Sequence, residues 1–172
     1  MGLKKLLISM QSISNTPLVS VIMNCYNGER YLQKSIDSIY TQTYQNWEII
    51  FWDNASTDSS ANIVKDYDKR IKYHLASKTT PLGEARNFAL EKVSGEYIAF
   101  LDCDDVYSPD KLQKQVKLMH NKNYAMCYGS AVIINERGKE IKRNIVKNKS
   151  GNIFSNLLMN IPLKMVLKIL NR

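Results

Sequence analysis

The sequence predicts an α/β fold in which helices cover both faces of a mostly parallel central sheet. Short runs of β-branched and aromatic residues alternate along the chain with segments that carry apolar residues at helical spacing. The first two strand-like runs are continuous stretches rich in β-branched and aromatic residues, which is typical of parallel strands buried on both faces. The length of 172 residues, with 44% hydrophobic and 23% charged residues, suits one globular domain.

The first two strands are expected at residues 18–25 (LVSVIMNC) and 47–53 (WEIIFWD). Each is followed by turn-forming residues and then by a predicted helix. The core-facing residues share helical spacing and are Leu32, Ile36, Ile39 and Tyr40 in the first helix and Ile63, Val64 and Tyr67 in the second.

The pattern continues with predicted strands at residues 71–75 (IKYHL) and 97–102 (YIAFLD). Between them lies a predicted helix over residues 81–93, with Ala85, Phe88, Ala89 and Val93 on one face. Ser108 and Pro109 have the residue types of a helix cap and first helical position, and Leu112, Val116 and Met119 would face the core after them. Residues 125–134 and 139–143 flank the turn NERG and predict an antiparallel pair.

Three regions are expected along the chain. Residues 1–17 form an N-terminal extension, since their apolar stretch is too short for a signal peptide and no cleavage site follows. Residues 18–145 form the folded domain. Residues 146–172 form a basic amphipathic tail that Pro162 divides into two short helices, which either pack on the sheet or lie on an anionic membrane surface. No window has the ~18 apolar residues that a spanning helix needs.

The charge balance favours anionic partners. The chain has 24 Lys and Arg against 16 Asp and Glu, which gives a formal net charge of +8 and a pI near 9.3. Nucleotides, nucleic acid and an acidic membrane face all fit this excess. The cysteines Cys25, Cys103 and Cys127 form no CxxC pair, so we expect reduced thiols in a cytosolic protein and no structural zinc site.

Polar residues gather where the predicted strands end, in the segments NCYN (24–27), DNASTD (53–58) and DCDD (102–105). Ligands of open α/β sheets bind outside the carboxyl ends of the strands, so these segments predict a binding site. Each residue also has a purely structural interpretation. Asp53 and Asp58 could cap a turn and a helix, Tyr26 could pack or stack on a flat base, and Arg86 could be solvated or hold a phosphate.

The acidic segment is the most informative one. Asp102, Asp104 and Asp105 follow a buried apolar run, where like charges at ~4 Å cost about 1–4 kcal/mol without compensation. Partial desolvation would add to that cost. Carboxylates suit Mg²⁺ or Mn²⁺, which binds one or two of them together with substrate phosphates. We therefore expect a divalent cation that arrives with a diphosphate.

The stretch from VSVIMNCYNGERYLQ to WDNASTD, followed by PLGEARNFALEKVSGEYIAFLDCDDVYSPDKL, resembles the nucleotide-sugar-binding half of family 2 glycosyltransferases. The resemblance covers residues 18–115 and implies the A-type glycosyltransferase fold, a Rossmann-like sheet, with a DxD motif. The implied donor-binding residues are Tyr26 stacking on the base, Asp53 on the base edge, Asn27 beside them, Arg86 on the nucleotide and Asp102 on the ribose. Asp104 is the implied metal ligand, with Asp102 as a second ligand.

The resemblance also implies an activity: transfer of a sugar from a nucleotide-diphosphate sugar, most simply a UDP-sugar, to a glycan or lipid-linked acceptor on the cytoplasmic side of a membrane. It implies no nucleic-acid partner. The family's catalytic base is not identified here, because no Asp or Glu follows Glu140. The domain is therefore expected to be truncated at its C-terminal side.

Two alternatives stay open. One is a nucleotide-sugar-binding remnant that does not transfer sugar. The other is a haloacid-dehalogenase-type phosphatase, whose strand-DxD motif would make Asp102 the nucleophile and Asp104 the acid/base. That motif normally opens its domain, whereas strand–helix units precede it here.

Overall fold

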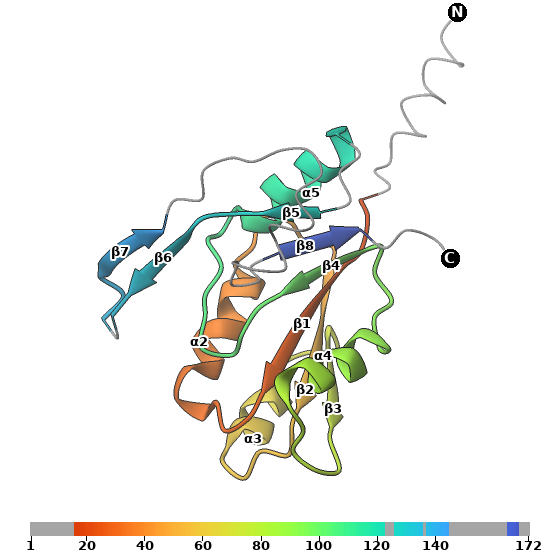
Figure 1. Cartoon of the computed structure of the whole chain (residues 1–172), viewed down its shortest axis with the longest axis vertical. Helices are drawn as coiled ribbons and strands as arrows, with labels where there is room; N and C mark the ends of the chain where they lie inside the picture. Colours follow the sequence, from red (N-terminus) through yellow and green to blue (C-terminus); the bar gives the residue numbers. More distant parts are fainter. Residues whose placement is uncertain (1–15, 123–125, 136, 145–164, 169–172) are drawn as a thin grey trace, which may run out of the picture.

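The computed structural model describes residues 16–122, 126–135, 137–144 and 165–168. Its centre is a six-stranded sheet in the order β3-β2-β1-β4-β8-β5 (Figure 1). These strands are β1 (Val19–Cys25), β2 (Trp47–Asp53), β3 (Ile71–Leu75), β4 (Tyr97–Phe100), β5 (Met126–Tyr128) and β8 (Met165–Lys168). β1 pairs in parallel with β2 and β4, and β2 pairs in parallel with β3. The predicted α/β class and mostly parallel sheet are confirmed.

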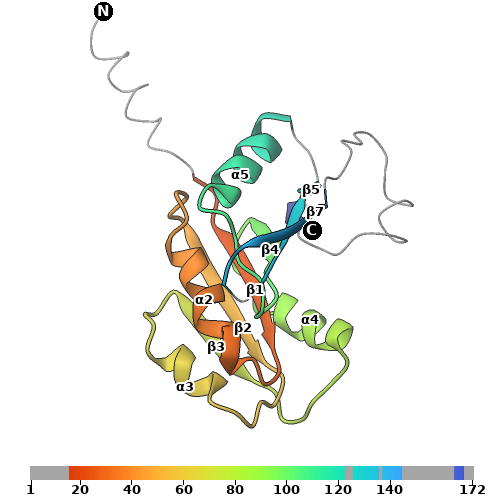
Figure 2. The same ribbon diagram turned by 90° about the vertical axis from the view of Figure 1, so that its left-hand side faces the viewer.

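Helices cover both faces of the sheet. Figure 2 shows α2 (Glu29–Tyr40), α3 (Ser60–Lys65) and α5 (Lys111–Lys122) on one side and α4 (Leu82–Leu90) on the other. Successive residues of β1 point to opposite faces of the sheet, because side chains alternate along a strand. Val21 and Met23 pack with α2 and α5, and Ile22 packs with α4. Within the described residues, no helix is long and apolar enough to cross a bilayer.

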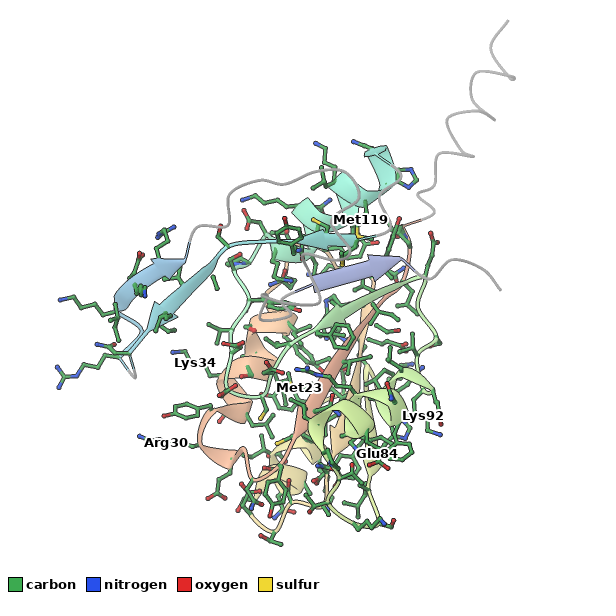
Figure 3. The ribbon with its side chains drawn as sticks, in the orientation of Figure 1. Met23, Arg30, Lys34, Glu84, Lys92 and Met119 are labelled. Atoms are coloured by element: carbon green, nitrogen blue, oxygen red, sulfur yellow. The ribbon has the colours of Figure 1, made fainter. Side chains whose placement is uncertain are left out.

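The main core lies on the α2 side. Met23 on β1 and Met119 on α5 are both fully buried in it (Figure 3). The predicted core-facing residues Leu32, Ile36 and Ile39 of α2 are also completely buried. Continuous burial of β1 and β2 on both faces explains why their sequences show no alternation of apolar and polar residues.

Two element boundaries on either side of the acidic segment differ from the prediction, and α4 ends at Leu90 and not at residue 93. β4 ends at Phe100, so the acidic residues lie in a loop beyond it. α5 begins at Lys111, because Ser108 and Pro109 form a turn in which the Ser108 carbonyl accepts the Lys111 N–H at 3.0 Å. The buried Gln42 side chain instead accepts the Leu112 N–H at 3.0 Å and so provides the cap.

The predicted antiparallel pair is confirmed as β6 (Ala131–Ile134) and β7 (Glu140–Asn144), which form a separate two-stranded sheet. The expected strand at 125–134 is divided, because β5 leaves it to join the main sheet. The helix expected in the tail is wrong for residues 165–168. These residues form β8, which runs antiparallel between β4 and β5. Residues 1–15, 145–164 and 169–172, which make up most of the predicted extension and tail, lie outside the described residues.

The strand at 165–168 has a physical explanation. Without β8, the hydrogen-bonding groups on one edge of β4 and of β5 would have no backbone partner at this position in the sheet. Such open edges pair with an available extended segment. A four-residue segment has too few turns for helical spacing to outweigh that pairing, so tertiary context decides its conformation.

Candidate functional site

The site follows from the strand order. β1 lies between β2 and β4, and the chain reaches these neighbours through helices on opposite faces, α2 and α4. The strand order reverses at β1, with β2 on one side and β4 on the other, and open α/β sheets bind ligands at the carboxyl ends of the strands at such a switch point; we call this end of β1 and β4 the crevice. All three polar segments predicted from the sequence lie at this end.

The loops after β1 and β2 are tied into one unit. Asn27 has a positive φ of 52°, and its side-chain oxygen accepts the Thr57 N–H at 2.8 Å. The Asn27 N–H in turn donates to the Ser56 hydroxyl at 3.0 Å. Asp58 accepts the N–H groups of Glu29 at 2.9 Å and Ser60 at 3.0 Å. Asn27 and Asp58 thus shape the crevice, and the capping interpretation of Asp58 is confirmed.

Asp53 is buried at the end of β2, and both of its oxygens are used within the chain. Oδ1 accepts the Ser56 N–H at 2.7 Å, as in a turn cap. Oδ2 accepts the Tyr73 hydroxyl at 2.7 Å. Burial, together with this hydrogen bond, raises the pKa of the Tyr73 phenol. The geometry matches the turn-capping interpretation, and a contact between Asp53 and a base remains a prediction.

Two asparagines were not singled out from the sequence. The Asn54 amide is buried, donates to the Thr80 carbonyl at 2.8 Å and accepts the Thr80 N–H at 3.1 Å, which ties the loops after β2 and β3 together. The Asn24 amide nitrogen is buried on β1 without a hydrogen-bond partner among the described residues. Each lies within a polar segment quoted above. An asparagine in the sequence does not by itself show whether its amide joins two loops or donates to a ligand.

The acidic loop after β4 is exposed, which corrects the expectation of a desolvated carboxylate cluster. The Asp102 side chain is 50% exposed, and Asp104 is exposed as well. The Arg86 guanidinium of α4 donates to Asp102 Oδ1 at 2.8 Å. The chain therefore supplies one counter-charge itself, and repulsion between Asp102 and its neighbours is smaller than the sequence suggests because water screens exposed charges.

Serine hydroxyls of helix α2 hold the acidic loop after β4 in place. The Ser35 hydroxyl lies 2.8 Å from the Cys103 carbonyl and 2.6 Å from the Asp105 carbonyl, so its single proton is shared between them. The Ser38 hydroxyl accepts the Tyr107 N–H at 3.0 Å. The Tyr107 hydroxyl closes the loop by donating to the Phe100 carbonyl at 2.6 Å. Sequence reasoning missed both serines, because small polar residues on a helix look like a solvated face.

Two predicted residues remain available to a ligand. The Tyr26 ring is 54% exposed. The Asp104 carboxylate has no hydrogen bond or ion pair with any residue that the structure describes. No group of three or more metal-binding side chains gathers in the described part of the chain. The Asp102 and Asp104 carboxylates therefore fit a Mg²⁺ or Mn²⁺ ion whose coordination is completed by substrate phosphates, and not an all-protein metal cage.

Two thiols lie under the crevice. A Cβ atom on Gly28 would lie 2.7 Å from Cys25 Sγ and 3.0 Å from Cys103 Sγ, so a larger residue at this position would have to displace a sulfur. The hydrogen bond between the thiols lowers the pKa of Cys25 and raises that of Cys103. All three cysteines are free, as the sequence predicts.

The fold is that of a Rossmann-like α/β domain, and its β1/β4 switch point is the candidate ligand site. The particular family follows from comparison with known proteins. Residues 20–167 match the family model described as glycosyl transferase family 2, and the chain belongs to that family. This confirms the resemblance found in the sequence.

Relatives and solved structures agree. An uncharacterized glycosyltransferase of Haemophilus influenzae is 42% identical, over 74% of this chain and 52% of its own. The Escherichia coli UDP-Glc:alpha-D-GlcNAc-diphosphoundecaprenol beta-1,3-glucosyltransferase WfgD is 41% identical, over 69% of this chain and 47% of its own. The chain thus spans about half the length of these relatives. The crystal structure of S. aureus TarS 1-349 in complex with UDP-GlcNAc shares the fold, with a TM-score of 0.72 at 22% identity over 87% of this chain and 45% of that one.

Proposed function

We propose that the protein is a glycosyltransferase that binds a nucleotide-diphosphate sugar, most simply a UDP-sugar, with Mg²⁺ or Mn²⁺ at the β1/β4 crevice. One observation carries the proposal: in a family 2 chain, the exposed Tyr26 and Asp104, which has no partner among the described residues, lie on loops from the two strands that flank the switch point. The TarS structure was solved with UDP-GlcNAc, which supports a UDP-sugar as the donor.

The residues divide the binding work by their chemistry. Tyr26 offers an aromatic face on which the base can stack. Asp104 would ligate the cation, and Asp102, held by Arg86, would contact the cation or the ribose. Arg86 brings positive charge to the crevice, which favours a diphosphate. A bound divalent cation would neutralise the charge that develops on the departing nucleoside diphosphate. Asp53 and Asn27 would contact the base from the neighbouring loops.

The acceptor is proposed to be a glycan or a lipid-linked sugar at the cytoplasmic face of a membrane. The name of the WfgD relative states that its acceptor is linked to diphosphoundecaprenol. The attacking acceptor hydroxyl needs a base, and no Asp or Glu follows Glu140 in this chain. This absence keeps a second candidate, a domain that binds the donor without transferring the sugar.

A thermal-shift panel tests the binding claim. UDP, GDP, UDP-sugars and UMP would be added with and without Mn²⁺. A ligand at ~100 times its dissociation constant stabilises the fold by about 2.7 kcal/mol. We expect stabilisation by a nucleoside diphosphate that increases with Mn²⁺. A lack of response to every nucleoside diphosphate would contradict the proposal.

Asp104→Asn tests the metal ligand. Because Asp104 is exposed and without a partner among the described residues, the substitution should leave the unliganded melting temperature unchanged. It should remove the Mn²⁺-dependent part of the stabilisation by UDP. The matched control is Asp66→Asn, an exposed carboxylate just after α3. If Asp104→Asn keeps the full Mn²⁺ effect, Asp104 is not the ligand.

Transfer is tested separately, by following radiolabelled sugar from the donor into polyprenyl-diphosphate-linked acceptors. Incorporation identifies a transferase. Binding of the donor without incorporation identifies the second candidate. Hydrolysis of p-nitrophenyl phosphate that is lost in Asp102→Asn would instead identify a phosphatase.

A further inference from the structure

Cys25 and Cys103 lie next to each other where β1 and β4 end. In the parallel pair, Ile22 is opposite Phe100, and the Leu101 N–H still donates to the Ile22 carbonyl at 3.0 Å. Cys25 lies three residues after Ile22 at the end of β1, and Cys103 lies three residues after Phe100 in the turn beyond β4. A disulfide needs Cα atoms ~4.4–6.8 Å apart.

The two side chains also point toward each other. Both sulfurs lie within 3.0 Å of the point where Gly28 would carry a Cβ atom, so the two sulfurs are neighbours beneath this residue. Cys25 is buried and lies 3.6 Å from the Ser60 hydroxyl, while Cys103 is half-buried. A small reagent that enters from the crevice therefore reaches Cys103 first.

We propose that Cys25 and Cys103 form a reversible disulfide that controls donor binding at the site above them. The control rests on the proposed function, whereas the disulfide itself does not. Disulfides of cytosolic proteins are mostly transient and redox-sensing, and a pair under a binding loop suits that use.

The chemistry balances with a low-molecular-weight disulfide, such as oxidised glutathione, as the oxidant. One sulfur of the pair attacks a sulfur of the oxidant, which releases one glutathione thiol and leaves the other glutathione bound to that cysteine. The second sulfur of the pair then attacks the sulfur of the first, and the second glutathione leaves as a thiol. One protein disulfide forms, the oxidant is reduced to two thiols, and the two cysteine protons end on them. Excess reduced glutathione reverses both steps.

The disulfide would change the crevice because each cysteine is the sequence neighbour of proposed donor-binding residues. Cys103 separates Asp102 from Asp104, and Cys25 immediately precedes Tyr26. A sulfur–sulfur bond of about 2.05 Å would fix the loops after β1 and β4 relative to each other, and the Cys103 carbonyl is also held by Ser35. We expect the oxidised protein to bind UDP with Mn²⁺ about tenfold more weakly, a typical size for coupling between two sites.

Thiol counting decides whether the disulfide forms. The full chain would be incubated with oxidised or reduced glutathione, unfolded in acid, alkylated and weighed by mass spectrometry. The reduced chain has three cysteines to label, and the oxidised chain should label only at Cys127. Cys127→Ala should lose both remaining labels on oxidation, while Cys103→Ser and Cys25→Ala should each fail to form the internal bond. Three labels after oxidation, or only a stable glutathione adduct, would overturn the proposal.

The effect on binding is measured on Cys127→Ala by titrating UDP with Mn²⁺ into the reduced, oxidised and re-reduced protein. Weaker binding on oxidation that recovers on reduction supports control of the donor site. Unchanged affinity with a formed disulfide overturns the control. If the reduced protein binds no nucleotide although the disulfide forms, the proposed function fails while the modification site stands.

Discussion

At the residue scale, the polar side chains of the crevice fall into two groups. Asp53, Asn27 and Asp58 already satisfy backbone or side-chain groups of neighbouring loops. Tyr26 and Asp104 expose their functional groups to the crevice side of the sheet. Substitution in the first group should therefore change stability and binding together, since it removes hydrogen bonds that join neighbouring loops. Substitution in the second group should change binding alone.

Tyr26→Ala tests this separation. A base stacked on an aromatic ring is worth about 1–3 kcal/mol, so we expect UDP affinity to fall by that amount. The melting temperature should not change, because the ring is more than half exposed. Isothermal titration with UDP and a thermal melt without ligand measure the two quantities.

The control for Tyr26→Ala is Tyr31→Ala, which removes another exposed tyrosine, from helix α2. Tyr26→Phe should keep most of the affinity, since the ring remains. Equal affinity of Tyr26→Ala and the unsubstituted protein would show that the ring does not stack on the base.

At the scale of elements, α2 and the turn after it hold both the acidic loop after β4 and helix α5 in place. Ser35, Ser38 and Gln42 lie on one face of the chain around this helix and are all buried. The serines hold the loop after β4. Gln42 donates to the Ser108 carbonyl at 2.7 Å and accepts the Leu112 N–H, which caps α5. The position of the DxD segment thus depends on a helix that is distant from it in sequence.

Gln42→Ala should therefore lower the free energy of unfolding by about 1–3 kcal/mol, because buried backbone groups lose their partners. Urea unfolding at pH 7 measures the loss. Gln33→Ala is the matched control, since Gln33 is an exposed glutamine on helix α2. A loss as small as that of the control would mean that water replaces the amide.

A second network fixes the opposite end of the sheet. Glu48 is buried on β2 and accepts the Ser20 hydroxyl at 2.6 Å and the Ser94 hydroxyl at 2.7 Å. Lys72 on β3 forms an ion pair with it at 2.6 Å. Burial acts to raise the pKa of Glu48, but the hydrogen bonds from Lys72 and the serines outweigh it, so the pKa lies below its ordinary value.

This direction fixes the pH dependence. A carboxyl whose pKa is lower in the folded state stabilises the fold above its unfolded pKa, about 4.3, and loses that contribution as the pH falls through the folded pKa. Glu48→Gln should thus be less stable than the unsubstituted protein at pH 7, with a difference that narrows below about pH 4. Urea unfolding at several pH values measures it. Glu84→Gln, at an exposed glutamate, is the control, and a difference independent of pH would contradict this account.

At the scale of the whole molecule, sequence predicted the parallel part of the sheet but not its completion. The runs that form β1 and β2 are apolar on both faces, and only a strand covered on two sides explains them. β8 could not be predicted, because its conformation depends on the open edges of β4 and β5 and not on its own four residues.

The site was predictable to the same extent. Polar residues directly after the predicted strands located the crevice, because parallel strands bring their carboxyl ends to one edge of the sheet. They did not tell which oxygens the chain uses itself: Asp53 and Asp104 are the same residue type, yet Asp53 is fully engaged and Asp104 is not. The contacts of Ser35 and the pairing of Arg86 with Asp102 depend on helix packing, which no local pattern encodes.

The position of β8 between β4 and β5 leads to a last prediction. Val166 is opposite Ala99 on β4 and Cys127 on β5, so its backbone lies between two strands of the main sheet. Proline there removes an N–H donor and fits poorly between neighbours on both sides. Val166→Pro should lower the melting temperature and promote aggregation, because β4 and β5 regain open edges. Val132→Pro is the control, since β6 pairs only with β7 in the separate sheet. If β8 completes the sheet, Val166→Pro must destabilise the protein more than Val132→Pro; equal melting temperatures would show that the sheet does not need this strand.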